Sequence, residues 1–225
     1  MSALDFTIRT QGDMVQAVDR LGFLPFFANV IPRFSIEELV DRRVWFAEDD
    51  GPWEWKGPVI REAGCAYGKF FEGRAAFISR EWFPDFANYR RDGYDFDARY
   101  EEGIAPYREN ELYRLVEANG PLTSRRLKQI GGYGKEGKKG FDALITRLQA
   151  QAYVVISDFV YATNRAGERY GWGIAEYATP EQVFGPEFAA RAYEREPEES
   201  WARMVSHLTR LLPRAGEAAI RKFLQ

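Results

Sequence analysis

The chain has 225 residues, a formal net charge of −3 at pH 7, 45% hydrophobic residues and 29% charged residues. The length allows one large domain or two small ones, and the composition is that of an ordinary folded globular protein. A single cysteine, Cys65, excludes an intramolecular disulfide. A single histidine, His207, argues against a histidine-rich zinc site and a Ser-His-Asp triad, and we expect it to be structural or solvated.

No secretory segment opens the sequence and no long apolar run occurs, so we expect a cytoplasmic protein with no membrane-spanning part. We also expect no metal and no cofactor. Aromatic residues are abundant, with 6 Trp, 12 Tyr and 17 Phe. Many of these rings must pack in the core, because a protein of this size that exposed them all would aggregate.

The first region, residues 1–103, is predicted to be an aromatic-rich mixture of helices and strands. Asp13 is placed to cap an amphipathic helix that extends to Leu21. Ser35 and Glu38 have the spacing of a capping box and predict a second, short helix.

Residues 48–58 follow, and we predict that they form a turn. Trp53 and Trp55 are two apart, a spacing that puts both rings on one face of an extended segment. Two such rings could stack on a nucleobase, although core packing is the more common use. Residues 66–79 are then expected to form a β-hairpin with Glu72-Gly73 at its turn.

Three aspartates close this region, Asp92, Asp95 and Asp97. They do not match the order of ligands in an EF-hand loop, which needs carboxylates before the glycine and a closing glutamate. We therefore expect them to cap turns and to pair with neighbouring arginines.

The middle region, residues 104–185, has the element order of a winged helix, and we predict that fold for it. A helix is expected over residues 110–118. Thr123 or Ser124 can then cap a short second helix, which the glycines at 131 and 132 end.

A third helix and a hairpin complete the predicted winged helix. Hydrophobic residues from 141 onward follow one helical stripe, and the period then changes to that of a strand. Residues 153–156 are strand formers, residues 164–167 supply a turn, and residues 170–174 alternate on a return strand. The stripe consists of Phe141, Leu144, Ile145, Leu148 and Ala152.

Positive charge gathers in the same region. Residues 125–147 include seven basic and two acidic residues, so this segment has a net charge of +5 within a chain of net charge −3. A localised basic face suits phosphate binding, although runs of charge are also common on solvated turns. The seven residues are Arg125, Arg126, Lys128, Lys135, Lys138, Lys139 and Arg147.

The third region, residues 186–225, begins with an acidic stretch. Trp201, Val205 and Leu208 then mark a last amphipathic helix, which Pro213 ends. Residues 217–224 are expected to add one or two further turns.

Several stretches resemble the AlkZ-related winged-helix proteins. LITRLQAQAYVVISDF with YGWGIAEYATPEQVFG, the aromatic segment at residues 53–58, and the hairpin AYGKFFEGRAAFIS carry the likeness, which extends to about Gly185. The resemblance implies a relation to bacterial DNA glycosylases that are built from tandem winged helices. Those enzymes release alkylated bases, including interstrand crosslinks.

The resemblance also implies a Gln-x-Gln motif that positions water against the sugar beneath an alkylated base, and Gln149-Ala150-Gln151 fits it formally. Residues two apart in a regular helix point about 200° away from each other, so Gln149 and Gln151 could converge on one water only in an extended chain. The family's motif also lies in an earlier winged helix. The two glutamines are candidates whose expected geometry argues against catalysis.

The leading hypothesis is therefore an α+β protein whose central winged helix binds duplex DNA and which is related to DNA repair glycosylases. The basic residues would hold phosphates, Thr146 and Arg147 would approach the groove, and Arg165 or Arg169 in the wing would add a contact. A second hypothesis is a glycosylase acting on alkylated bases. A third is a non-catalytic protein-interaction or dimerisation module, for example a homodimer, with a groove lined by Trp53, Trp55 and Trp82.

Overall fold

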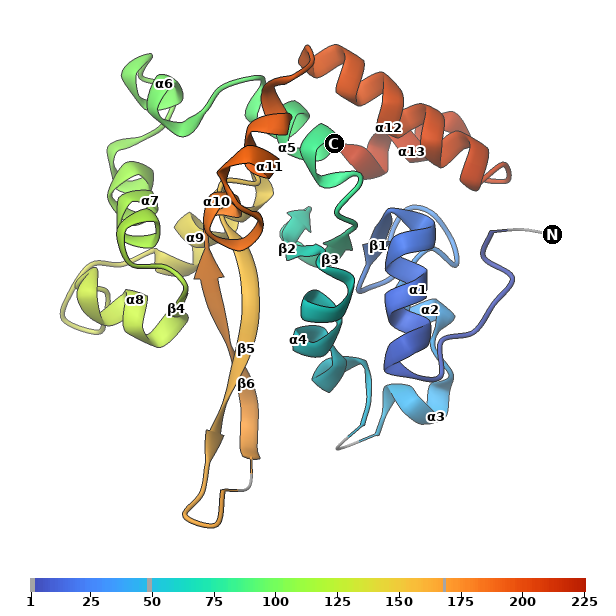
Figure 1. Cartoon of the computed structure of the whole chain (residues 1–225), viewed down its shortest axis with the longest axis horizontal. Helices are drawn as coiled ribbons and strands as arrows, with labels where there is room; N and C mark the ends of the chain where they lie inside the picture. The colour runs from blue at the N-terminus through green and yellow to red at the C-terminus, as the bar shows by residue number, and fades with distance from the viewer. Residues whose placement is uncertain (1–2, 48–49, 168) are drawn as a thin grey trace.

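The computed structural model describes residues 3–47, 50–167 and 169–225. The protein has an α+β fold with two three-stranded antiparallel sheets, shown with its helices in Figure 1. No helix within those ranges has both the length and the apolar character needed to cross a bilayer. Buried residues from all three predicted regions belong to one hydrophobic cluster.

The first sheet contains β1 (Phe23–Pro25), β3 (Arg74–Ile78) and β2 (Ala66–Phe71), in that order. The predicted hairpin is confirmed, with Glu72-Gly73 between its strands. Helix α1 (Gln11–Leu21) precedes the sheet.

The predicted cap of α1 is wrong. Thr10 is the N-cap, and its hydroxyl accepts a hydrogen bond from the Asp13 backbone N–H at 3.1 Å. The Asp13 carboxylate lies three positions further on and accepts from the Thr10 N–H at 3.0 Å, so the two residues form a capping box.

Between β1 and β2, the described residues form the helices α2 (Ile36–Leu39), α3 (Arg42–Trp45) and α4 (Pro52–Ala63). The predicted short helix and its Ser35 N-cap are confirmed, since the Glu38 N–H donates to the Ser35 hydroxyl. The reciprocal half of the capping box differs: the Glu38 carboxylate accepts from the Ser35 hydroxyl and from the Arg33 N–H.

The turn predicted over residues 48–58 is wrong for residues 52–58, which are helical, whereas Glu48 and Asp49 lie outside the described residues. Pro52 occupies the first turn of α4, where its missing N–H is no loss and its φ suits a helix. Trp53 and Trp55 consequently point in different directions rather than to one face. Trp55 is buried, and its indole N–H donates to the Asp50 carboxylate.

Helices α5 (Phe83–Arg91) and α6 (Phe96–Glu101) lead to the middle region. There, α7 (Tyr107–Asn119), β4 (Leu122–Thr123), α8 (Ser124–Ile130) and α9 (Phe141–Ala150) precede a long hairpin. That hairpin consists of β5 (Val155–Thr163) and β6 (Arg169–Ala178), and β4 pairs with β6, so the strand order is β4–β6–β5.

The local signals of this region are confirmed. The Thr123 hydroxyl accepts from the Arg126 N–H and caps α8, which ends at Gly131. All five residues of the predicted stripe from Phe141 to Ala152 are buried. Helix α9 ends at Ala150, two residues before the stripe does, because the chain turns toward β5 at Ala152, whose φ is 59°.

The C-terminal region consists of α10 (Pro180–Phe184), α11 (Pro186–Ala190), a 3-10 turn at Arg191–Tyr193, α12 (Pro197–Leu211) and α13 (Glu217–Leu224). Helix α12 packs against α5, where Arg203 pairs with the buried Asp85 at 3.2 Å. His207 is structural, as expected: its ring stacks on Trp82 at 4.2 Å and its Nε2 donates to the Leu21 carbonyl.

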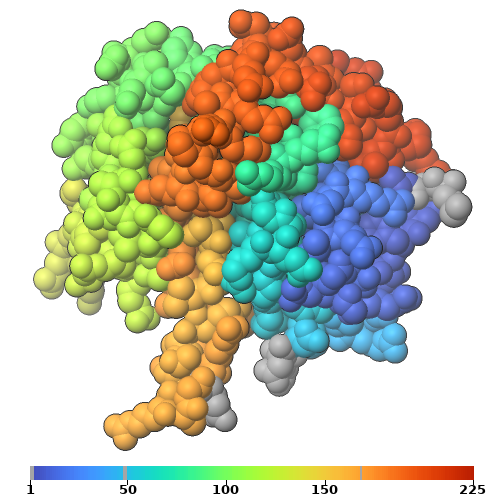
Figure 2. All heavy atoms as spheres, viewed as in Figure 1, coloured from blue at the N-terminus to red at the C-terminus, as the bar shows by residue number. Residues whose placement is uncertain are grey.

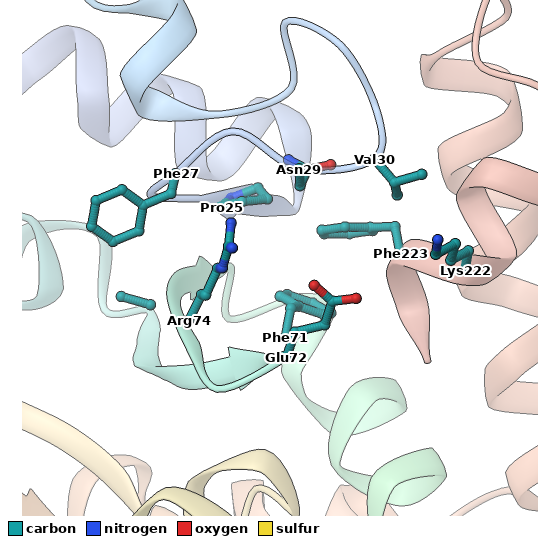
Figure 3. Close-up of a pocket in the computed structure, with 10 residues that line it drawn as sticks. Pro25, Phe27, Asn29, Val30, Phe71, Glu72, Arg74, Lys222 and Phe223 are labelled. Atoms are coloured by element: carbon teal, nitrogen blue, oxygen red, sulfur yellow. The ribbon is translucent and has the colours of Figure 1, made fainter.

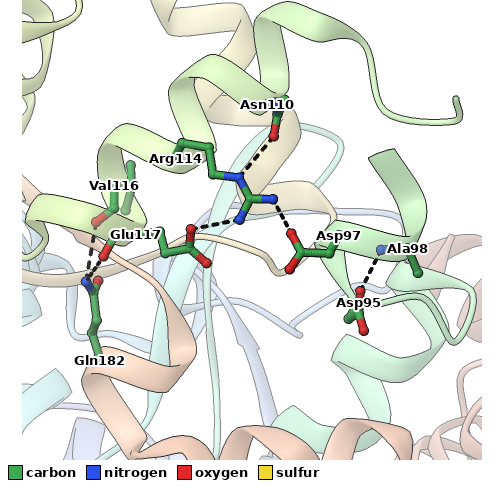
Figure 4. A network of polar contacts seen from close by, with 8 residues as sticks. All are labelled: Asp95, Asp97, Ala98, Asn110, Arg114, Val116, Glu117 and Gln182. Atoms are coloured by element: carbon green, nitrogen blue, oxygen red, sulfur yellow. Dashed lines mark hydrogen bonds and ion pairs between the residues drawn. The ribbon is translucent and has the colours of Figure 1, made fainter. Parts of the chain in front are cut away.

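Polar contacts fix the middle region to its neighbours. In Figure 4, Arg114 of α7 binds Asn110 and Glu117 on its own helix and Asp97 of α6. The Gln182 amide of α10 donates to the Glu117 carbonyl at 2.8 Å. Helix α7 is therefore held from both sides and forms a rigid support for α8 and α9.

Candidate nucleic-acid interface

The seven predicted basic residues come from one continuous stretch of chain but differ in their partners. Three of them pair with carboxylates: Lys128 with Asp142 at 3.0 Å, Lys138 with Glu111 at 3.0 Å, and Arg147 with Glu109 at 2.7 Å. Glu109 and Glu111 belong to α7, so they add two negative charges that the window from 125 to 147 does not contain. The basic face is therefore partly neutralised from within the protein.

The other four have no carboxylate partner among the described residues: Arg125, Arg126, Lys135 and Lys139. All four are exposed. Arg126 donates to the Gln129 side-chain carbonyl at 2.7 Å, and the Lys139 ammonium donates to the Gly134 and Lys135 carbonyls. These four cations are the ones available to an external anion.

The loop from 131 to 140, which carries three of the lysines, is closed by its own backbone. The Tyr133 N–H donates to the Lys128 carbonyl at 2.8 Å, and the Lys138 N–H donates to the Gly132 carbonyl at 2.8 Å. The Tyr133 ring packs edge-on against Phe141 and anchors the loop to α9. Gly137 is required here, because a Cβ at this position would collide with the Gly132 carbonyl.

Lys138 is the most firmly held of the loop lysines. Its ammonium donates to the Glu111 carboxylate, and this hydrogen bond raises the pKa of Lys138 above its ordinary value. Its Nζ also lies 6.0 Å from the Tyr133 ring centroid. Lys138 therefore stays charged but already has a partner.

The two residues predicted to approach a groove from α9 are placed differently. Arg147 is exposed and its Nε donates to the buried Glu109 carboxylate, which orients its guanidinium. Thr146 is half-buried and lies beside the β2–β3 turn, with its Cγ2 3.6 Å from where a Cβ on Gly73 would stand. The C-terminal half of α9 thus lies against the first sheet. Arg147 is more accessible to solvent than Thr146.

The hairpin carries the last two predicted contacts. Arg165 lies in the turn that links β5 to β6, which the Gly167 N–H closes by donating to the Asn164 carbonyl at 3.0 Å. Arg169 begins β6, and its guanidinium lies 5.4 Å from the Tyr161 ring centroid. Both are exposed on a hairpin that projects beyond the rest of the molecule, in orange in Figure 2.

The glutamine pair does not converge. Gln149 is fully buried within α9, where its amide donates to the Ile145 carbonyl at 3.0 Å and accepts from the Lys69 N–H of β2 at 3.1 Å. Gln151 lies just beyond the last turn of the helix, and its Oε1 is buried with no hydrogen-bond partner among the described residues. Both ends of the Gln149 amide are thus occupied: its oxygen joins α9 to β2, and its NH2 group bonds within α9.

The predicted three-tryptophan groove is wrong. Trp55 is buried, and Trp82 stacks on His207 and lines a depression with Arg203 and Arg210. Trp53 instead lines a hollow between the hairpin and α3–α4. Two exposed rings of that hollow, Phe46 and Trp172, were not predicted as binding residues from the sequence. Trp172 looks there like one more alternating residue of a strand.

A separate small cavity lies where α13 meets the β2–β3 turn (Figure 3). Phe71 and Phe223 stack there at 4.4 Å, and two of the polar side chains around them, Arg74 and Asn29, bond to the backbone. The Arg74 guanidinium donates to the Ala28 carbonyl at 3.2 Å, and the Asn29 amide donates to the Phe34 carbonyl at 2.7 Å. Within the described ranges, no group of three or more His, Cys, Asp or Glu side chains could hold a metal ion.

Comparison with known proteins decides the relationship. A family model described as "AlkZ related" matches residues 8–225. The chain belongs to the AlkZ-related family. The match extends past Gly185 through α12 and α13, so the C-terminal helices are part of what this AlkZ-related chain shares with its family. Neither the curated proteins nor the solved structures contain a match.

Proposed function

We propose that residues 104–185 form a winged helix that binds duplex DNA. Three features support this: the order helix, strand, helix, helix, hairpin; the pairing of β4 with β6; and the projection of the hairpin from the body. In this proposal α9 is the groove-facing helix and β5–β6 is the wing. With these domain boundaries, residues 1–103 form an N-terminal flanking region and residues 186–225 a C-terminal one.

The observation that carries the proposal is a set of four exposed cations that pair with no carboxylate of the described residues: Arg125, Arg126, Lys135 and Lys139. Phosphate oxygens would be the carboxylate-like partners that these side chains lack. Arg147 would add a contact from α9, and Arg165 and Arg169 would add contacts from the wing. Lys128, Lys138 and Thr146 contribute less, since the two lysines are paired and Thr146 is half-buried.

The test is binding of a duplex oligonucleotide at low salt by the protein and by the double charge reversal Arg125→Glu with Lys135→Glu. The reversal is expected to weaken binding at least tenfold, because two attractive contacts become repulsive. Arg214→Glu is the matched control, since Arg214 is exposed in the loop between α12 and α13. Equal affinities for the protein and the double reversal would overturn the proposal.

We also propose that the protein acts in the cytoplasm and that its activity is related to that of DNA repair glycosylases. The reaction to assay is the release of an alkylated base from DNA. This rests on the family and on Gln151, whose Oε1 has no hydrogen-bond partner in the described part of the chain, whereas the Gln149 Oε1 already accepts from Lys69. The assay is release of an N-alkylated purine from damaged duplex by the protein and by Gln151→Ala. If release is no faster than the uncatalysed background, the proposed glycosylase activity is rejected, whereas the proposed DNA binding is not affected by that result.

A further inference from the structure

An aromatic hollow lies between the hairpin and helices α3–α4. We use this name for the surface formed by Trp45, Phe46, Ala47, Trp53, Glu54 and Trp172. Two of its rings are largely solvent-exposed, Trp172 at 79% and Phe46 at 73%. Large rings are usually buried, so exposed rings gathered around a hollow mark a binding surface.

The backbone of β6 is built to present Trp172. Between the pairs Val160↔Ile174 and Ala162↔Tyr170, β5 advances two residues while β6 advances four, so β6 bulges around Trp172. Glycines flank it: Gly171 has a φ of 72°, and a Cβ on Gly173 would lie 2.9 Å from the Tyr161 ring. Bulges of this kind re-aim a side chain, and here the indole is turned out of the strand.

The floor of the aromatic hollow is rigid. Trp53 lies 5.5 Å from Trp45 and 4.9 Å from Phe26, measured between ring centroids, and meets Trp172 edge-on at 6.5 Å. The Lys56 ammonium lies 5.3 Å from the Trp53 ring centroid. Because its neighbours fix the Trp53 ring, a flat ligand would bind to a preformed surface, and the conformational-entropy cost of binding would be small.

One polar group of the hollow lacks a partner. Glu54 Oε2 is buried and has no hydrogen-bond partner among the described residues. An ionised carboxylate can only accept hydrogen bonds, and leaving its oxygen buried without a donor is unfavourable. This oxygen lies toward Gly51, so a ligand in the aromatic hollow that supplies an N–H donor would remove that penalty once the carboxylate rotates toward it.

We propose that the aromatic hollow binds one unpaired nucleobase that bears an exocyclic amino group. The rings supply stacking, which every base can use, and Glu54 accepts from the amino group. The hairpin that presents Trp172 also carries Arg165 and Arg169, which would hold the adjoining backbone. This inference rests on the proposed DNA binding and adds that the wing contacts a nucleobase as well as phosphates.

The experiment compares three duplexes of equal length: fully paired, with one unpaired cytosine, and with one unpaired thymine. The protein is expected to favour the unpaired cytosine, because its exocyclic amino group can donate to Glu54, whereas the only N–H of thymine, at N3, lies between two carbonyl oxygens that a carboxylate repels. Trp172→Ala should bind that duplex about tenfold more weakly and the paired duplex with unchanged affinity, since one stacked base is lost. Trp172→Phe should keep most of the preference, and Glu54→Ala should make cytosine and thymine equal. Identical affinities of the protein and Trp172→Ala for the unpaired-cytosine duplex would overturn the proposal.

A second arm separates this inference from DNA binding itself. Cytidine, which carries no phosphate, is tested by saturation-transfer NMR against the protein and Trp172→Ala. Transfer to the cytosine ring that disappears in the variant supports the hollow even if no duplex binds, which would overturn only the proposed function. Duplex binding without transfer and without preference for the unpaired base would overturn only the hollow.

Discussion

The Arg147 guanidinium Nε of α9 donates to the Glu109 carboxylate of α7 at 2.7 Å, and the Glu109 side chain is only 3% exposed. This ion pair links two of the helices that we assign to the winged helix. It also fixes the direction of the one arginine of α9 that could reach a groove. The other Glu109 oxygen has no partner among the described residues, so the carboxylate depends on Arg147.

Removing Arg147 should therefore destabilise the protein as well as weaken DNA binding. Arg147→Ala leaves a buried carboxylate unpaired, and we expect a loss of about 1–2 kcal/mol, below the value for a fully buried pair because Arg147 is half exposed. Urea unfolding measures this loss. The double variant with Glu109→Gln should recover most of it, whereas simple additivity of the two single variants would show that the pair is not coupled.

The two glutamines should behave differently on truncation. Gln149→Ala removes the acceptor of the Lys69 N–H and leaves a small cavity, so we expect a loss of about 2–3 kcal/mol in the free energy of unfolding. Gln151→Ala removes a side-chain oxygen that has no hydrogen-bond partner among the described residues and should cost under about 1 kcal/mol. Equal losses in urea unfolding would contradict the assignment of Gln149 as the link between α9 and β2. Gln151→Ala is accordingly the cleaner probe of catalysis.

The lysine loop offers a matched pair of glycine substitutions. Gly137→Ala would drive a Cβ into the Gly132 carbonyl and should open the loop, with a loss of about 1–3 kcal/mol and weaker duplex binding. Gly134→Ala is the control, because its Cβ would meet nothing within 4 Å. Thermal unfolding and duplex affinity of the two variants are compared. A Gly137→Ala protein that matches Gly134→Ala in both measurements would show that the loop is not closed in this way.

His207 predicts a pH dependence of stability. Burial lowers the pKa of His207 below its ordinary value, so the folded protein favours the neutral ring that stacks on Trp82 and donates to Leu21. The unfolded chain takes up the proton first as pH falls below about 6.5, so this contribution to stability is complete above that pH and is lost below it. Urea unfolding at about pH 7.5 and about pH 5.5 should show a smaller decrease for His207→Gln than for the protein itself. The same decrease in both would exclude His207 as its source.

Elements with strong local signals could be predicted from the sequence. The Thr123 cap, the glycine after α8 and the stripe from Phe141 each depend on neighbours within a few positions, and all three are confirmed. Helix α4 could not be predicted, because Gly51 and Pro52 are typical of turns and become a helix start only once Trp55 is buried beneath them.

The electrostatics of the candidate interface could be predicted only in part. The basic window was evident, but its neutralisation by Glu109 and Glu111 requires α7 to pack beside α9 and the loop, and no local pattern reveals that contact. The aromatic hollow was missed for the same reason. Phe46 and Trp172 are distant in the chain, and only the folded protein brings them to one surface.

The slope of duplex affinity against salt concentration tests the central claim most directly. If the four exposed cations hold phosphates, alone or together with Arg147, Arg165 and Arg169, the logarithm of the binding constant should fall linearly with the logarithm of salt concentration, with a slope of about −3 to −6. Arg125→Ala with Lys135→Ala should reduce the magnitude of this slope by about 2, because two phosphate contacts are lost, and Arg214→Ala should leave it unchanged. A slope near zero for the protein, or the same slope in the double variant, would contradict the assignment of this face to DNA.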